Sequence, residues 1–277
     1  MKLSAWVFMT DLLPEKRTIF DKIVVSKLSK QNIFYGNNIS SIFHNLKKSG
    51  IDGIELLVSS NATNSDIKKI QKILNKHNIS VLSIHQSLTT LFNIKISEIT
   101  KLFEIAKLFS AKIIVLHLSS ISNKIFEKDY IVALQKLEKK YSVTIGFENN
   151  PKHPLSIFKP FTWRGKDFSS LTSEKELKIT FDTTHLAQTG GDILEFYKIN
   201  KNRIINIHLS DYKKNFINKY LLLTKGTHLT LGTGGLPIVE FLKELKKDHY
   251  KGHITMEIDS NLDGLCHGAQ FIKKIFI

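Results

Sequence analysis

Side chains that could bind a metal ion follow six successive apolar runs of the sequence. They are His85, His117, Glu148, Asp182, His208 and Glu257. Imidazole and carboxylate groups are ligands for Mn, Zn, Co or Mg, and the preference depends on how many nitrogen atoms contribute. One or two such residues could be ordinary buried polar groups with hydrogen-bond partners. Six successive endings are poorly explained in that way, and we therefore predict a divalent-metal site.

Four of these residues are the best candidates for ligands of one ion. Glu148 and Glu257 follow the fifth and eighth apolar runs, while Asp182 and His208 follow the two runs between them. If the runs are strands of a closed barrel, the two glutamates lie nearly opposite each other and both can contact one central cation. Further metal or substrate contacts are expected from His85, His117, His185 and His228. His185 also has the simpler interpretation of capping a helix after the sixth run.

Several other residues carry weaker hypotheses. A loop after the fifth run could close over a substrate through Trp163, Arg164 and Lys166. That these residues merely lie on the surface is an equally good interpretation. Glu55 is interpreted as a residue that lines the interior rather than a ligand, and Asp211 as a partner of a ligand or a helix cap. Residues 232–235 (Gly-Thr-Gly-Gly) could cradle a phosphate with backbone amides, but a plain turn before Pro237 is favoured.

The elements that must position these side chains alternate regularly along the chain. We predict strands at residues 2–8, 53–58, 79–85, 112–118, 143–148, 177–182, 204–209 and 253–258. Helices are predicted at 40–48, 65–77 (with Ser65 as N-cap), 96–109, 128–141, 192–200, 237–247 and 262–276, with helical character in 14–30. The strands are nearly continuous apolar runs, as expected where both faces are covered. This pattern predicts an α/β fold, a (β/α)₈ TIM barrel in which residues 1–277 form a single domain. A doubly wound open sheet is disfavoured because no Gly-x-Gly-x-x-Gly turn follows the first strand.

Composition limits the class of protein and its surroundings. No apolar run in the 277 residues approaches the roughly 20 needed to span a bilayer. A single cysteine, Cys266, excludes an internal disulfide and favours a reducing, cytoplasmic location. The net charge of +15 could reflect a surface that binds polyanions, but only three of the 40 basic residues are arginine. The favoured explanation is therefore a codon bias of an AT-rich genome.

Taken together, these residues resemble the xylose isomerase-like barrel superfamily. The resemblance runs from residues 50–56 (Gly-Ile-Asp-Gly-Ile-Glu-Leu) to Met256 and Glu257. Its epimerase-like branch implies one divalent ion held by Glu148, Asp182, His208 and Glu257. In that branch the two glutamates move a proton beside the carbonyl of a sugar, sugar phosphate or related polyol, and the residue matching His185 contacts the substrate. The sequence of residues 228–234 also resembles a loop of that branch.

The endonuclease IV-like branch of the superfamily implies a different activity. There, two or three zinc ions cleave DNA at abasic sites, and the matching positions also include His85, His117, His185 and His228. That branch has an aspartate where this sequence has Gly226, which puts the third metal site in doubt. We therefore expect a metal-dependent isomerase or epimerase with a small carbohydrate substrate, and keep the zinc-dependent apurinic endonuclease as the alternative. Substrate, metal identity and oligomeric state stay open.

Overall fold

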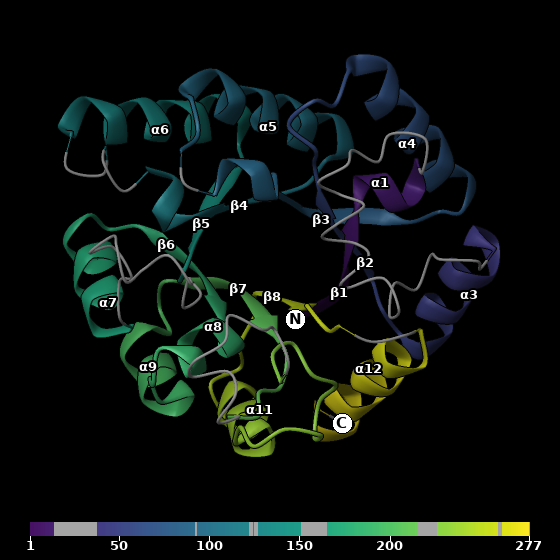
Figure 1. Cartoon of the computed structure of the whole chain (residues 1–277), viewed down its shortest axis with the longest axis vertical. Coiled ribbons are helices and arrows are strands. Elements are labelled where there is room, and N and C mark those ends of the chain that lie inside the picture. The colour runs from purple at the N-terminus through teal and green to yellow at the C-terminus, as the bar shows by residue number, and fades with distance from the viewer. Residues whose placement is uncertain are drawn as a thin grey trace.

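The chain folds into a closed barrel of parallel strands surrounded by helices. The computed structural model describes residues 1–13, 38–91, 93–121, 124, 127–150, 165–214, 226–259 and 262–276. In sequence order, each strand pairs with the next, and the eighth pairs in parallel with the first. Figure 1 shows the helices as an outer ring around the strands. The predicted single-domain (β/α)₈ TIM barrel is confirmed.

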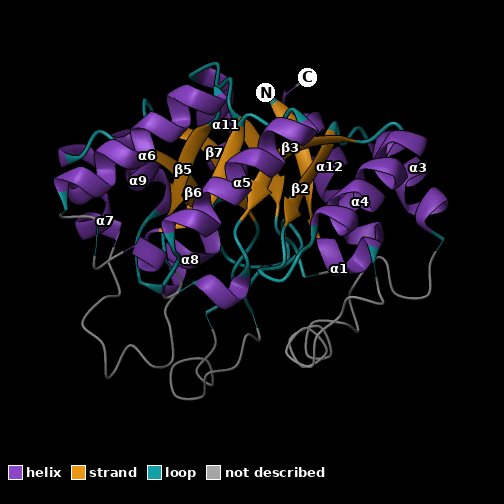
Figure 2. Cartoon of the chain, turned by 90° about the horizontal axis from the view of Figure 1, so that it is seen from above, coloured by secondary structure: helices purple, strands orange, loops and turns teal. Residues whose placement is uncertain are grey.

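The strands are β1 (Lys2–Phe8), β2 (Gly53–Leu57), β3 (Ser80–His85), β4 (Ile113–His117), β5 (Thr144–Glu148), β6 (Lys178–Asp182), β7 (Ile204–Leu209) and β8 (His253–Met256). The helices are α1 (Met9–Leu12), α3 (Ile39–Ser49), α4 (Asn64–Lys76), α5 (Ile96–Phe109), α6 (Lys128–Tyr141), α7 (Gly165–Glu174), α8 (Thr183–Gln188), α9 (Ile193–Asn200), α11 (Ile238–Lys247) and α12 (Leu262–Phe276). Short 3₁₀ turns, η2 (Leu88–Thr90) and η3 (Leu118–Ile121), follow β3 and β4. In the side view of Figure 2, both chain ends lie at one end of the barrel, opposite the loops that follow the strands.

Element boundaries differ from the predicted ones in a few places. Helix α4 is capped by Thr63 rather than Ser65, because Thr63 and Asp66 cap each other's backbone amides at 3.2 and 3.0 Å. Pro237 is the N-cap of α11 instead of its first helical residue. The helical character predicted for residues 14–30 lies outside the described residues.

Apolar side chains fill the space between strands and helices, whereas the barrel interior is partly polar. Outward-facing residues such as Ile54, Leu56 and Phe181 belong to the buried apolar core. Inside the barrel, hydrogen bonds link side chains that we call the polar layer: Ser4, Glu55, Ser83, Asn206 and Thr255. All five are fully buried. TIM-barrel interiors are usually filled with branched apolar residues, so this layer departs from the rule.

None of the described helices is both long enough and apolar enough to cross a membrane.

Candidate metal centre

The barrel brings the four predicted ligands together at the C-terminal ends of its strands. Glu148 and Asp182 are the last residues of β5 and β6, His208 lies in β7, and Glu257 directly follows β8. The His208 Nδ1 atom lies 2.8 Å from Glu257 Oε2, 3.3 Å from Glu148 Oε1 and 3.9 Å from Asp182 Oδ2. One potential ligand atom from each of the four residues lies within 4.8 Å of the others.

These four atoms have the properties of a cation site. Glu148 Oε1, Asp182 Oδ2, His208 Nδ1 and Glu257 Oε2 are all buried, and none has a hydrogen-bond partner within the described part of the chain. Even the 2.8 Å contact between His208 and Glu257 lacks hydrogen-bond geometry. Leaving several buried polar atoms unsatisfied is costly, and a cation among them would remove that cost. Three oxygens and one nitrogen fit Mn, Zn, Co or Mg.

The two carboxylate oxygens of Asp182 have different roles: one caps a helix, and the other faces the cluster. Its Oδ1 accepts the backbone N–H of His185 at 2.6 Å and thereby caps α8, which leaves Oδ2 for the cluster. His185 is therefore the capped residue, not the cap. The Asn149 side chain accepts the backbone N–H of Asp182 at 2.8 Å and donates to its backbone carbonyl at 2.9 Å. Sequence reasoning missed Asn149, and its only signal was its place directly after Glu148.

The remaining predicted histidines surround the two central carboxylates. The Nε2 atoms of His85 and His117 lie 3.2 and 3.1 Å from Glu148 Oε2. The Nδ1 atom of His185 lies 3.1 Å from Glu148 Oε1 and 3.7 Å from Asp182 Oδ2. Among the described residues, three further groups of potential ligands adjoin the central four. Two of them flank the four, namely His85, His117 and Glu148, and Asp182, His185 and His228. The third consists of Glu55, His85 and His208.

His228 reaches the site from a loop that is held by Asp211. The Asp211 carboxylate accepts backbone N–H groups from Tyr212, Gly232, Gly234 and Leu236, at 2.8 to 3.0 Å. Backbone hydrogen bonds between Asp211 and Leu229 close the base of this loop. Because Asp211 occupies the amides of Gly232 and Gly234, the turn interpretation of residues 232–235 is supported and the phosphate cradle is not. Asp211 itself contacts this loop instead of capping a helix.

The buried acids and histidines of this cluster shift one another's pKa values. Burial opposes ionisation of Glu148, but the imidazoles of His117 and His208 outweigh it and hold the pKa of Glu148 well below its ordinary value. Burial likewise opposes charge on His208, yet Glu55 and Glu148 hold its pKa well above 6.5. Burial lowers the pKa of His117 to about 4. The carboxylates around His185, led by Asp182, overcome burial and raise its pKa to about 9.

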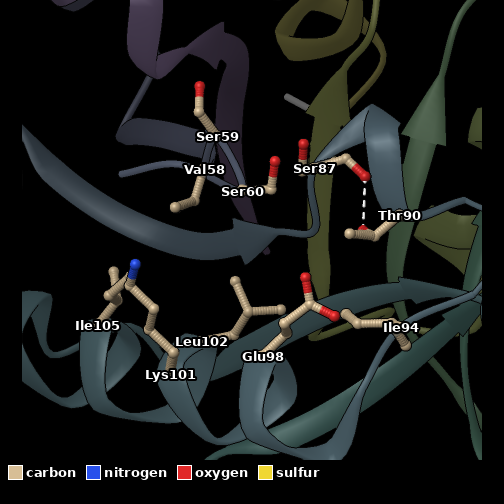
Figure 3. Close-up of a pocket in the computed structure, with 10 residues that line it drawn as sticks. All are labelled: Val58, Ser59, Ser60, Ser87, Thr90, Ile94, Glu98, Lys101, Leu102 and Ile105. Carbon is tan, nitrogen blue, oxygen red and sulfur yellow. Dashed lines mark hydrogen bonds between the residues drawn. The ribbon is translucent and has the colours of Figure 1, made fainter. Parts of the chain in front are cut away.

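The loop predicted to close over a substrate is one further region, and a small pocket is another. Trp163 and Arg164 lie outside the described residues, and Lys166 lies in the first turn of α7 with its side chain outside the description. A separate pocket lies between the loops after β2 and β3 and helix α5, lined by Ser59, Ser87, Thr90 and Lys101 among others (Figure 3). Its volume of ≈ 30 Å³ suits ordered water better than a sugar ring.

Comparison with known proteins identifies the family. Residues 43–275 match the model of the xylose isomerase-like TIM barrel family. The chain belongs to this family. An uncharacterised protein of Mycobacterium leprae is 20% identical over 256 residues, which cover 82% of this chain and 86% of that protein. An inosose dehydratase of Clostridium perfringens is 27% identical over 99 residues, or 33% of each chain.

Several solved structures share the barrel at low sequence identity. The 3-keto-D-glucoside 4-epimerase of E. coli superimposes with a TM-score of 0.65 at 13% identity, covering 99% of each chain. A D-tagatose 3-epimerase-like protein gives a TM-score of 0.61 at 18% identity, covering 99% of this chain and 97% of that one. The IOLI protein with a bound zinc atom gives 0.64 at 15% identity, covering 100% of this chain and 98% of that one. At these identities, the likeness establishes the fold.

Proposed function

We propose that the protein is a divalent-metal-dependent isomerase or epimerase acting on a sugar, sugar phosphate or related polyol. The observation that carries this proposal is the cluster of four buried, unsatisfied atoms from Glu148, Asp182, His208 and Glu257. Two of its members are glutamates on strand ends separated by β6 and β7, so that they approach the centre from different directions. Family members named as epimerases and as a dehydratase support a carbohydrate substrate.

The side chains of this site can hold and move protons beside a carbonyl. A divalent cation held by the four residues would polarise the substrate carbonyl and make the neighbouring C–H more acidic. The pKa of Glu148 is held well below its ordinary value and the pKa of Glu257 is lowered to about 2, so both are carboxylates that can accept a proton. One glutamate removes the proton and the other returns it, while His185 contacts the substrate. The Glu257 side chain, 12% exposed, lies nearer to solvent than that of Glu148, 1% exposed.

Hydrogen–deuterium exchange tests the proposal even though the substrate is unidentified. The protein, supplied with Mn²⁺, is incubated in D₂O with a panel of ketoses and inososes, and NMR follows the proton beside each carbonyl. Epimerisation, isomerisation and dehydration beside a carbonyl all begin with loss of such a proton, so the assay covers all three. Metal-dependent exchange of at least one compound is expected.

Matched variants assign the exchange to the glutamates. Glu148→Gln and Glu257→Gln are each expected to slow exchange by about 10²-fold or more, the usual contribution of a general acid or base. Glu240→Gln, at an exposed position on α11, serves as the control and should leave the rate unchanged. Wild-type exchange in Glu148→Gln would show that the mechanism is wrong.

A second candidate function, abasic-site cleavage of DNA by two or three zinc ions, is favoured by the two flanking groups of ligands. They share Glu148 and Asp182 with the central four and are completed by His85, His117, His185 and His228. The net charge of +15 also suits a polyanionic substrate. Against it stands Gly226, where that branch has an aspartate.

Ion counting separates the two functions. Elemental analysis after dialysis against zinc is expected to give one tightly held ion per chain for the isomerase and two or three for the nuclease. A nicking assay on duplex DNA with one abasic site is the direct test, and cleavage with zinc would decide in favour of the nuclease.

A further inference from the structure

Directly beneath the metal centre, Glu55 is a fully buried carboxylate whose two oxygens have different surroundings. Its Oε2 accepts hydrogen bonds from Ser83 Oγ at 2.6 Å, Asn206 Nδ2 at 3.1 Å and Thr255 Oγ1 at 3.3 Å. Its Oε1 lies 2.9 Å from His208 Nε2, an ion-pair contact in which neither atom has a hydrogen-bond partner among the described residues. These partners come from β3, β7 and β8, while Glu55 comes from β2, so they converge across the barrel.

An ionised carboxylate at this depth is expensive. Moving a charge from water into a protein interior costs several kcal/mol even after relaxation, and well-packed apolar residues often give equal or greater stability. The imidazoles of His208 and His85, with the hydrogen bond from Ser83, outweigh burial and keep the pKa of Glu55 below its ordinary value. Fold stability therefore gives no reason for a charge here, and the contact with His208 gives a functional one.

The geometry at His208 explains what the charge does. An imidazole can present a lone pair on one nitrogen while the other carries a proton, and the partner of the protonated nitrogen selects the tautomer. With Glu55 against Nε2, the proton belongs on Nε2 and the lone pair on Nδ1. The Nδ1 atom is the one that faces Glu148, Asp182 and Glu257.

We propose that Glu55 is a positioning residue that sets the tautomer and orientation of His208 for metal binding, and that the three hydrogen bonds to its Oε2 hold it in place. This inference rests on the proposed metal site and deepens it. Ser83, Asn206 and Thr255 all contact Oε2, which orients the carboxylate so that Oε1 points at His208. A carboxylate behind a ligating histidine also makes the imidazole a stronger donor, and losing such a partner typically weakens metal binding by about 10–100-fold.

The test is a metal titration of the full-length Glu55→Gln variant. Co²⁺ is used as the probe because its visible absorption reports its ligands, and competition with a chelator gives the dissociation constant. Glu55→Gln keeps the shape but removes the charge, so Co²⁺ binding should weaken by about 10–100-fold. Thermal unfolding of the metal-free variant checks that it folds, and its midpoint should fall because the change removes one partner of a buried ion pair.

Ser4→Ala is the matched control. Ser4 belongs to the polar layer and bonds Thr255 Oγ1 at 2.9 Å, but it is not among the hydrogen-bond partners of Glu55 named above. Its removal should leave the dissociation constant for Co²⁺ unchanged. Ser83→Ala is the second variant, because it removes the 2.6 Å hydrogen bond while keeping the charge. It should weaken Co²⁺ binding several-fold and keeps the test available if Glu55→Gln does not fold.

Proton NMR measures the chemical shift of the His208 Nε2 proton, which would not change if Glu55 only stabilised the fold. The His208 Nε2 proton, buried against a carboxylate, should give a downfield resonance that is protected from exchange with solvent, and this resonance should shift upfield in Glu55→Gln. Wild-type Co²⁺ affinity in folded Glu55→Gln, or in Ser83→Ala if the first variant does not fold, would overturn the proposal. If the wild-type protein itself binds no divalent ion, the proposed function fails instead.

Discussion

The two halves of the barrel have different roles around the candidate centre. The four unsatisfied atoms all come from the half that begins at β5: Glu148, Asp182, His208 and Glu257. The other half, β1 to β4, supplies Glu55, His85 and His117, which contact Glu148 or His208. In the proposed site, one half would present atoms to a cation, and the other would orient the residues that carry them. A ligand must keep one atom for the cation, whereas a supporting residue needs only to hold a ligand in position.

The largest expected effect comes from breaking the ligand half at Asp182. Asp182→Asn keeps an oxygen to cap α8 but replaces the other oxygen with an amide that donates hydrogen and cannot bind a cation. Mn²⁺ affinity, measured by isothermal titration, should fall by about 100-fold or more, the upper end of the range known for weaker perturbations of metal sites. Thermal stability of the metal-free protein should stay near the wild-type value.

Comparison with Asp182→Ala separates the contribution of the capping oxygen from that of the ligand oxygen. It removes the cap as well as the ligand, so it should lose metal binding and also about 1 kcal/mol of stability. Equal stability of the two variants would show that the 2.6 Å cap to His185 contributes nothing measurable.

The next largest effect concerns the loop that brings His228 to the ligand half. Asp211→Ala removes an acceptor of four backbone N–H groups, at least two of which belong to the glycine turn. Hydrogen bonds to a charged group contribute about 1.5–3 kcal/mol, so urea denaturation should show a loss of about 2 kcal/mol or more. Mn²⁺ affinity should change little, because none of the four central residues lies on this loop. A large loss of affinity would mean that the loop helps to hold the ion.

A pH series examines His208 itself. In the metal-free protein the pKa of His208 is raised well above 6.5, so a proton competes for Nδ1 through the neutral range. Mn²⁺ affinity should therefore rise with pH, by up to about tenfold per unit, between about pH 6 and about pH 8. His185, with a pKa of about 9, acts in the same direction because its positive charge opposes the cation. Glu257, at about 2, stays ionised throughout and contributes no slope. A flat series would exclude His208 as a ligand.

Sequence patterns predicted the ligand half better than the supporting half. Alternating runs indicated the barrel, and a barrel requires residues at successive strand ends to meet, which explains why Glu148, Asp182, His208 and Glu257 were found. Their role in metal binding stays a prediction. Glu55 was interpreted as lining the interior, which is correct, but its contact with His208 was missed. One of its partners, Asn206, is 151 residues away, and no local pattern links the two.

Local competition explains the smaller errors. Thr63 and Ser65 are both good N-cap residues, and only the reciprocal bonds with Asp66 decide between them. Asp211 looked like a helix cap because an aspartate after a strand often is one. Its four backbone donors depend on the path of residues 226–236, which short-range propensity does not specify.

The smallest expected effect on metal binding comes from the supporting half, at His117. Its Nε2 contacts Glu148 Oε2, whereas the atom that faces the central cluster is Glu148 Oε1. With one ion, His117→Ala should therefore change Mn²⁺ affinity by no more than several-fold. Deuterium exchange should slow by a larger factor, because the carboxylate of Glu148 loses a contact that orients it. If His117 instead holds a second ion, the variant should lose one zinc per chain in elemental analysis. That result would remove the distinction between the two halves and favour the nuclease.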